Sequence, residues 1–430
     1  MCSDFARKKA NIVSLIKEKS KILFEYLLFF AEWTLISAFV GGICGILGSA
    51  FHICIDKSTE FRTHHTWLVV FLPLAAVLIR FIYHLFKSDV HLDTNLVIRS
   101  LRENNKIPLI MIPLIFFGTV ITQFFGGSAG REGAALQLGG SVGYNIGRLF
   151  RIKDNNMQII VMSGMAGVFS ALFGTPITAA VFSLEVASVG MIHYTALLPC
   201  FVSAIVSYGI AGLFGTSPVR FDGIDFGNIT ASLVAKTALL SVLLAVLSIL
   251  FCFVIEKTSH IARKYSPNGY FRAVACSLVV VGLTYLVGTY DYNGAGMFVV
   301  ERAMTGKADT FAFALKLLFT AVSLAAGLKG GEIVPAFFVG STFGCVVAPL
   351  LGIDPAVGAA IGFVALFCGV VNCPLASLIL SIEVFGTQGI LLFAVSCGIS
   401  YMLSGYFGLY RSQKIVYSKT NNEYIDKSVD

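Results

Sequence analysis

The stretch GGSAGREG at residues 126–133 places an acid, Glu132, inside a glycine-rich loop between two apolar segments. A second loop, KGGEIVP at residues 329–335, places Glu332 in the same setting 200 positions later. A charged and unpaired carboxylate near the centre of a bilayer costs at least about 2.5–3.5 kcal/mol, so acids in such places are neutral, paired or hydrated. The two loops therefore predict a buried site that accommodates charged groups.

The composition of the whole chain is that of a membrane protein. Of its 430 residues, 56% are hydrophobic and only 13% are charged, whereas soluble domains carry about 25% charged residues. Apolar stretches that approach the roughly 20 residues of a bilayer crossing recur along the chain. We therefore expect an all-α, multi-pass protein of the cell membrane, with the lipid bilayer as its environment. The net charge of +7 is attributed to residues flanking the spans, and no nucleic-acid partner is expected.

A longer match shows that the chain is duplicated. PITAAVFSLEV at residues 176–186 corresponds to PLASLILSIEV at residues 374–384, which is a shift of 198 positions. This shift is nearly that of the two glycine loops, and the blocks occur in the same order. Duplicated membrane halves are the common plan of secondary transporters and related channels.

The duplication sets the expected organisation of the chain. A basic cytoplasmic segment covers residues 1–23, and the first membrane repeat covers 24–215. A linker at 216–230 precedes the second repeat at 231–410, and a short cytoplasmic tail covers 411–430.

Both glycine loops precede expected helices, and a helix N-terminus carries unpaired N–H groups and about half a positive charge. The breaks at 126–133 and 327–331 are therefore candidate anion sites. Our hypothesis is that Glu132 acts as a tethered carboxylate that competes with a transported anion for these N–H groups, and that protonation releases it. The alternative is a static acid that caps the helix.

The first loop resembles the GREGP-type signature of the CLC family of anion channels and anion/proton antiporters, and the resemblance covers roughly residues 30–415. It implies two inverted-topology helical repeats, with broken, re-entrant helices that meet at a midplane anion site. It also implies a homodimer with one pathway per subunit and makes Glu132 the external gating glutamate. FGLY at 407–410 resembles the segment that supplies an internal tyrosine. The anion-binding residues assigned by position are Thr94, Asn95, Gly130, Arg131, Gly133, Gly331, Ile333 and Tyr410.

Several departures from the family's sequence motifs favour one branch of the family. The family's GSGIP motif is missing, and DTNLV at 93–97 leaves Thr94 or Asn95 in place of the anion-coordinating serine. Val186 stands where chloride/proton antiporters commonly carry a second glutamate, and Glu332 adds an acid to the second loop. These features resemble the fluoride/proton antiporter branch, in which the GGE glutamate takes part in coupling. Val334 lacks the hydroxyl group typical of that branch. A small anion, more readily fluoride than chloride, and protons are the expected substrates.

Two other interpretations remain open. A chloride/proton antiporter or a passive anion channel of the same family would share Glu132. The letters GGSAG at 126–130 also fit GxSxG, which would make Ser128 the nucleophile of a serine hydrolase with His52 or His193 as its base. That interpretation explains neither the duplication nor the two loop acids, so we expect a transporter and no enzyme.

The remaining polar residues of the apolar stretches receive mostly structural interpretations. Glu185 and Glu383 are repeat mates and are expected to form structural contacts. Arg80, Lys236, Lys316 and Lys329 are expected to reach the headgroups, and Lys329 alone lies near enough to Glu332 in sequence to influence it. The cysteines form no CxxC motif and the histidines no HExxH motif, so neither a metal nor a cofactor is expected.

Overall fold

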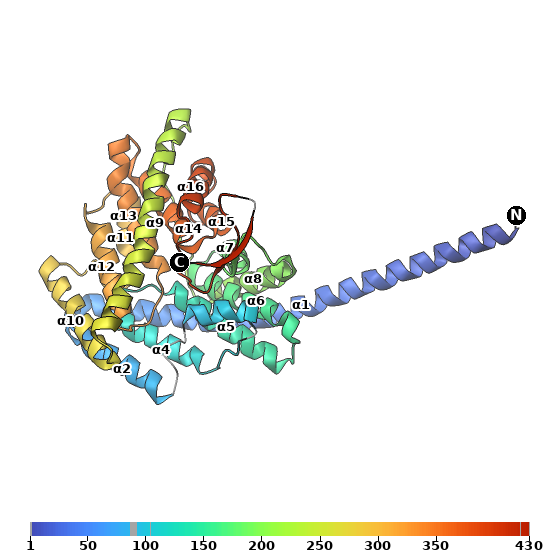
Figure 1. Ribbon diagram of the computed structural model, residues 1–430, viewed down its shortest axis with the longest axis horizontal. Coiled ribbons are helices and arrows are strands. Elements are labelled where there is room, and N and C mark those ends of the chain that lie inside the picture. The colour runs from blue at the N-terminus through green and yellow to red at the C-terminus, as the bar shows by residue number, and fades with distance from the viewer. Residues whose placement is uncertain (1, 87–92, 104, 422, 430) are drawn as a thin grey trace.

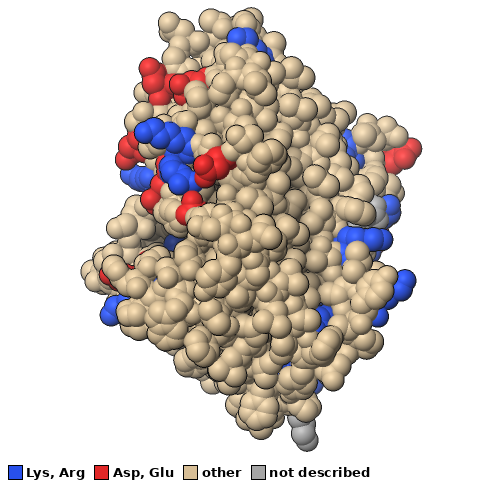
Figure 2. Space-filling model, turned by 90° about the vertical axis from the view of Figure 1, so that its left-hand side faces the viewer, with Lys and Arg blue, Asp and Glu red and all other residues tan. Residues whose placement is uncertain are grey.

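The computed structural model describes residues 2–86, 93–103, 105–421 and 423–429, with side chains from residue 17 onward. These residues form sixteen α-helices, three short 3-10 helices and three short strands (Figure 1). Seven helical segments are long and apolar enough to cross a membrane, and six shorter apolar helices of 10–17 residues accompany them. Most of the face shown in Figure 2 is free of charged side chains, as expected for a surface in contact with lipid.

The helices fall into two sets of eight. The first set is α1 Cys2–His64, α2 Leu72–Leu85, α3 Thr94–Glu103, α4 Met111–Phe124, α5 Glu132–Leu149, α6 Asp154–Phe173, α7 Pro176–Glu185 and α8 Leu197–Leu213. The second set is α9 Ala231–Tyr265, α10 Gly269–Val287, α11 Met297–Met304, α12 Ala312–Ala325, α13 Ile333–Val347, α14 Pro355–Val371, α15 Pro374–Phe385 and α16 Ile390–Leu403. The 3-10 helices are Thr66–Phe71, Tyr194–Ala196 and Ala348–Leu351.

Equivalent helices of the two sets pack in equivalent ways. Helix α5 packs on α6 as α13 packs on α14, and α8 contacts both α1 and α6 as α16 contacts both α9 and α14. The sets also meet each other through the pairs α2 with α10, α5 with α13 and α7 with α15. The duplication expected from the sequence is therefore the plan of the fold, and helices α5 and α13 follow the two glycine loops at equivalent places in it.

Glycine pairs bring the helices of each repeat close together. A Cβ added at Gly139 of α5 would lie 2.2 Å from the carbonyl oxygen of Gly164 of α6. In the second repeat, a Cβ at Gly344 of α13 would lie 2.0 Å from the carbonyl oxygen of Gly358 of α14. Small residues at such crossings let two backbones approach, which is a main source of attraction between helices in a membrane.

This packing makes a stability prediction. Gly344→Ala forces a methyl group against the Gly358 carbonyl and should destabilise the fold by roughly 1–3 kcal/mol. Gly398→Ala in α16 is the matched control, because a Cβ there meets no atom within 4 Å. Thermal unfolding in detergent should show a lower midpoint for Gly344→Ala only. Equal midpoints for the two variants would contradict the close packing.

Two acids, the buried Glu185 and the half-buried Glu383, join the repeats by each capping the helix that carries the other. Glu383 at the end of α15 accepts hydrogen bonds from the backbone N–H groups of Ile177 and Thr178 at the start of α7, at 3.0 and 2.7 Å. Glu185 at the end of α7 accepts from the N–H groups of Leu375 and Ala376 at the start of α15, at 3.2 and 2.9 Å. Each carboxylate satisfies donors that a helix start leaves unpaired, in agreement with the structural interpretation of this pair.

The C-terminal tail is folded, which the sequence did not indicate. Strand β2 Lys414–Tyr417 pairs antiparallel with β3 Tyr424–Ser428 and parallel with β1 Ser188–Val189, so a small sheet accompanies the all-α bundle. The ammonium of Lys419 donates to the carbonyl of Tyr401 at 2.9 Å and to the hydroxyl of Ser404 at 3.0 Å, near the end of α16. Burial lowers the pKa of Lys419 to about 8.

The N-terminal part of α1 projects from the bundle (Figure 1). Its apolar side chains, among them Leu23 and Phe30, are 60% and 52% exposed in the isolated chain. This arm includes most of the segment that was expected to be a basic cytoplasmic extension.

Candidate functional site

The two glycine loops meet in the middle of the protein. The N–H of Gly130 donates to the carbonyl of Gly331 at 2.6 Å, and the N–H of Gly331 donates to the carbonyl of Gly130 at 2.8 Å. A Cβ at Gly133 would lie 2.9 Å from the Cα atom of Gly331, so the loops touch through their backbones. Helices α5 and α13 begin directly after this contact. Their unpaired N–H groups therefore lie at one place, which favours a negative charge there.

Glu132 is fully buried at the start of α5. One of its carboxylate oxygens, Oε2, accepts a hydrogen bond from the backbone N–H of Arg131 at 3.0 Å. The other, Oε1, accepts no hydrogen bond and lies 3.6 Å from Nε of Arg131. Arg131 is the N-cap residue and not part of the helix. Its side chain can therefore lie beside that of Glu132, although neighbours within a helix do not face each other.

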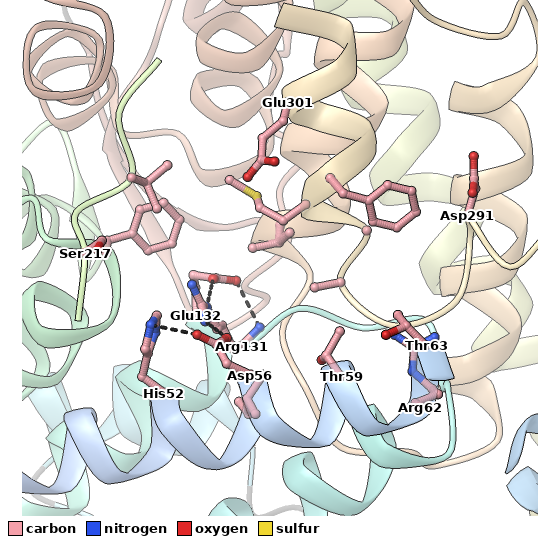
Figure 3. A pocket seen from close by; sticks show the side chains of 18 of the residues that line it. His52, Asp56, Thr59, Arg62, Thr63, Arg131, Glu132, Ser217, Asp291 and Glu301 are labelled. Carbon is pink, nitrogen blue, oxygen red and sulfur yellow. Dashed lines mark hydrogen bonds and ion pairs between the residues drawn. The ribbon is translucent and has the colours of Figure 1, made fainter. Parts of the chain in front are cut away.

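Arg131 is shared between two acids. Its Nη1 atom lies 3.0 Å from Oδ1 of Asp56 in α1, and Oδ2 of Asp56 lies 2.9 Å from Nε2 of His52 (Figure 3). A chain of four ionisable side chains thus leads from His52 to Glu132. Sequence analysis did not single out Asp56. The available signal was its spacing of four residues from His52, which places both side chains on one face of a helix.

These four residues line a large cavity, which we call the Glu132 cavity. Its volume is about 830 Å³, and its lining also includes Val334 of α13. Figure 3 shows Glu132 and Arg131 on one side of this space, with α1 running along its floor.

A second cavity, the Glu332 cavity, has a volume of about 240 Å³. Its polar lining residues include Glu332, Lys329, Asp93, Thr94, Asn95, Gln137 and Tyr410. Glu132 lines only the first of these two cavities and Glu332 only the second. The two loops that meet at Gly130 and Gly331 thus border different cavities, with Glu132 of the first loop lining one and Glu332 of the second loop lining the other.

Thr94 and Asn95, the two candidates for the missing serine, have different surroundings. The hydroxyl of Thr94 accepts from Nε2 of Gln137 at 2.9 Å, and a Cβ at Gly133 would lie 3.7 Å from it. The amide oxygen of Asn95 accepts from the backbone N–H of Ser412 at 3.0 Å, so this side chain anchors the tail. Thr94 is thus the candidate whose hydroxyl faces the helix start.

Tyr410 is 1% exposed, and among the described residues its hydroxyl group has no hydrogen-bond partner. A buried hydroxyl normally finds a partner, so this group is available to donate to a bound anion. The hydroxyl of Thr119 and the amide oxygen of Gln137 line the same cavity and also have no partner there. Sequence reasoning missed both residues, because each is a single polar letter in an apolar helix.

The remaining predicted residues surround the same contact. Ile333 is fully buried and opens α13 beside Gly331. Lys329 lines the Glu332 cavity with its ammonium 4.3 Å from the centre of the Tyr83 ring.

The position of Lys316 contradicts the expectation from the sequence that its side chain reaches the headgroups. Instead of reaching the headgroups it is fully buried, and its ammonium donates to the backbone carbonyls of Tyr292 and Gly294 at 3.1 and 2.7 Å. A turn of the chain that folds back into the protein supplies these acceptors, and no sequence pattern reveals it.

The hydrolase interpretation finds no support in this geometry. The hydroxyl of Ser128 is fully buried and lies 3.0 Å from the hydroxyl of Thr320, while its backbone N–H donates to Ser323. His52 is paired with Asp56 instead. Within the described part of the chain, no group of three or more His, Cys, Asp or Glu residues is arranged to hold a metal ion.

We therefore expect a fluorophosphonate probe to leave Ser128 unlabelled, because a reactive serine needs a base within hydrogen-bond reach. Peptide mass spectrometry of the treated protein measures this directly, with a serine hydrolase in the same mixture as the positive control. Labelling of the wild-type protein that disappears in Ser128→Ala would support the serine hydrolase interpretation.

A duplicated helical bundle in which two helix starts meet and border two cavities defines an integral membrane protein of the ion-transporting class. The family model described as voltage gated chloride channel matches residues 75–405, and the chain belongs to this family.

Relatives of the chain include both fluoride and chloride proteins. It is 32% identical to the chloride/fluoride channel protein of Pseudomonas syringae pv. tomato, over 92% of this chain and 89% of that protein. It is 26% identical to the H(+)/Cl(−) exchange transporter ClcA of Vibrio parahaemolyticus, over 81% of each. The crystal structure of a CLC-type fluoride/proton antiporter superposes with a TM-score of 0.87 and 29% identity, covering 90% of this chain and 98% of that one.

Proposed function

We propose that the protein is a secondary active transporter of the cell membrane that exchanges fluoride for protons and so exports fluoride. The observation that carries the proposal is the pair of carboxylates, Glu132 and Glu332, in separate cavities bordered by the two loops that meet at Gly130 and Gly331. The likeness to a chloride/fluoride channel protein and to a fluoride/proton antiporter supports the choice of ion.

Exchange follows from competition at the start of α5. A charged Glu132 carboxylate is held by Arg131 and by the backbone donors at the helix start. An anion needs the same positive region, so the two negative charges exclude each other. Protonation removes the charge of Glu132, and the anion then takes the place of the carboxylate at the helix start. When the cycle reverses, the side chain returns to the helix start and releases its proton. One proton movement is thereby tied to each anion movement.

The Glu332 cavity supports fluoride in particular. Fluoride is small and strongly hydrated, so a site for it must offer short hydrogen bonds in place of water. The unpartnered hydroxyl of Tyr410 supplies a donor near this place, and Glu332 supplies an acid that presents a proton. The alternative, a chloride/proton antiporter or a passive anion channel, has a precedent among the relatives but gives Glu332 no function.

The assembly and topology belong to the proposal. By analogy with the family, we place the Glu132 cavity on the external side and the tail on the cytoplasmic side, in a homodimer with one pathway per subunit. The exposed apolar residues Ile177, Leu197, Leu375 and Ile390 of α7, α8, α15 and α16 provide a face for a second copy.

Glu132→Gln tests the proposed gate. The amide keeps the shape of the side chain but carries neither charge nor proton, so fluoride should still move while the protons pumped per fluoride fall at least roughly tenfold. Ion-selective and pH electrodes on proteoliposomes measure both fluxes. Glu301→Gln is the control, because this acid lines the same cavity away from the helix starts. Proton pumping that survives in Glu132→Gln would contradict the assignment.

Glu332→Gln tests the choice of fluoride. Loss of the acid from the smaller cavity should reduce coupled fluoride exchange at least roughly tenfold, whereas the protein should remain folded because no ion pair within 4.0 Å is lost among the described residues. The same electrodes measure the exchange, and gel filtration checks the fold. Unchanged coupled exchange would assign Glu332 a structural function.

A further inference from the structure

A row of polar side chains on α1 faces the Glu132 cavity. His52, Asp56, Thr59, Thr63 and Thr66 follow one another at intervals of three or four residues, which is the spacing of a single helix face. The helix ends at His64, so Thr66 continues the row into the following 3-10 helix. His52 and Asp56 serve the Arg131 contact described above, and the row continues well beyond it.

Arg62 lies beside Thr59 and Thr63 of this row and lines the same cavity (Figure 3). It is only 4% exposed, and its Nε atom has no hydrogen-bond partner among the residues that the structure describes. In the described part of the chain it takes part in no ion pair. Arginine carries its charge under all ordinary conditions and offers five N–H donors, so this is a buried cation without a counter-charge.

A second buried basic side chain, Lys316, lies close to the same backbone segment as Arg62, at Gly294. A Cβ at Gly294 would lie 2.7 Å from Nη2 of Arg62, and the carbonyl of Gly294 accepts from Lys316 at 2.7 Å. Lys316 also takes part in no ion pair among the described residues. The acid nearest in sequence to this segment, Asp291, is paired with Arg302 at 3.1 Å.

Buried charges in proteins are normally paired, because removing an ion from water costs several kcal/mol that only an opposite charge or good hydrogen bonds can offset. A negative ion in the cavity beside Arg62 would offset this cost. The N–H at Nε of Arg62 has no acceptor among the described residues and is available to such an ion.

We propose that Arg62, with Lys316 close to it, forms an additional anion site in the Glu132 cavity, separate from the site at the helix starts. Arg62 follows Asp56 by six residues, which corresponds to about 9 Å along a helix. The ligand is a small inorganic anion of the kind that the protein transports, held by the guanidinium group of Arg62. The proposal rests on the proposed function, since it gives the transported anion a position outside the gate.

The site has a defined task in the exchange cycle. When Glu132 returns to the helix starts, the displaced anion moves into the Glu132 cavity, and Arg62 holds it there. This keeps the anion from re-entering before the carboxylate has occupied the N–H groups. Arg62 is on this account a binding residue for the anion and takes no part in proton transfer.

Chemical protection tests the site on the unmodified protein. Phenylglyoxal attacks arginine side chains, and peptide mass spectrometry reports the modification of each arginine separately. Fluoride should slow the modification of Arg62 and leave that of Arg220 unchanged, because Arg220 lines the same cavity but is exposed. Equal rates for Arg62 with and without fluoride or chloride would overturn the proposal.

Variants test the same site through transport. Arg62→Gln should raise the fluoride concentration for half-maximal exchange by roughly tenfold, because one charge-assisted hydrogen-bond donor is lost. The number of protons moved per fluoride should stay as in the wild type. Arg62→Lys should restore most of the affinity, and Arg220→Gln should change little. An unchanged half-maximal concentration, or a changed proton ratio, would contradict the assignment of Arg62.

The two proposals fail in distinguishable ways. Protection of Arg62 by chloride in a wild-type protein that moves no protons with fluoride would support the anion site and overturn the fluoride/proton exchange. Normal coupled exchange without protection of Arg62 would overturn the anion site alone.

Discussion

The backbone contact between Gly130 and Gly331 is the constraint on which the rest of the structure depends. Two mutual hydrogen bonds hold the loops together, and a side chain on either glycine would meet the opposite loop. Because α5 and α13 start at this contact, their unpaired N–H groups converge inside the protein, where no lipid reaches them. Helix starts that converge in this way attract negative charge, and both Glu132 and Glu332 lie beside them.

The duplicated packing explains how this contact is held. The helix that follows each loop packs on its neighbour through glycines, α5 on α6 and α13 on α14, so that both loops are presented from closely packed supports. The crossed caps of Glu185 and Glu383 join the repeats further along the chain. The tail adds a third connection, since Ser412 donates to Asn95 two residues from Tyr410. The side chains around the smaller cavity are therefore positioned by three separate parts of the chain.

Much of this was predictable from the sequence, because it depends on local pattern. Apolar length indicated the membrane, the shift between PITAAVFSLEV and PLASLILSIEV indicated the repeats, and loop glycines marked the helix starts around Glu132 and Glu332. What depends on distant contacts was not predictable. Asp56, Arg62 and Gln137 are brought to the cavities only by the folding of the chain, and Lys316 finds its acceptors in a turn that no pattern reveals.

The most direct test of the account is the coupling of fluoride to protons in the wild-type protein. Purified protein in liposomes is given an outward fluoride gradient, and fluoride and pH electrodes follow both ions, with chloride gradients in parallel. The account predicts fluoride efflux that drives protons against their gradient, with chloride nearly inert. Chloride that moves as readily as fluoride, or fluoride that moves without protons, would contradict it.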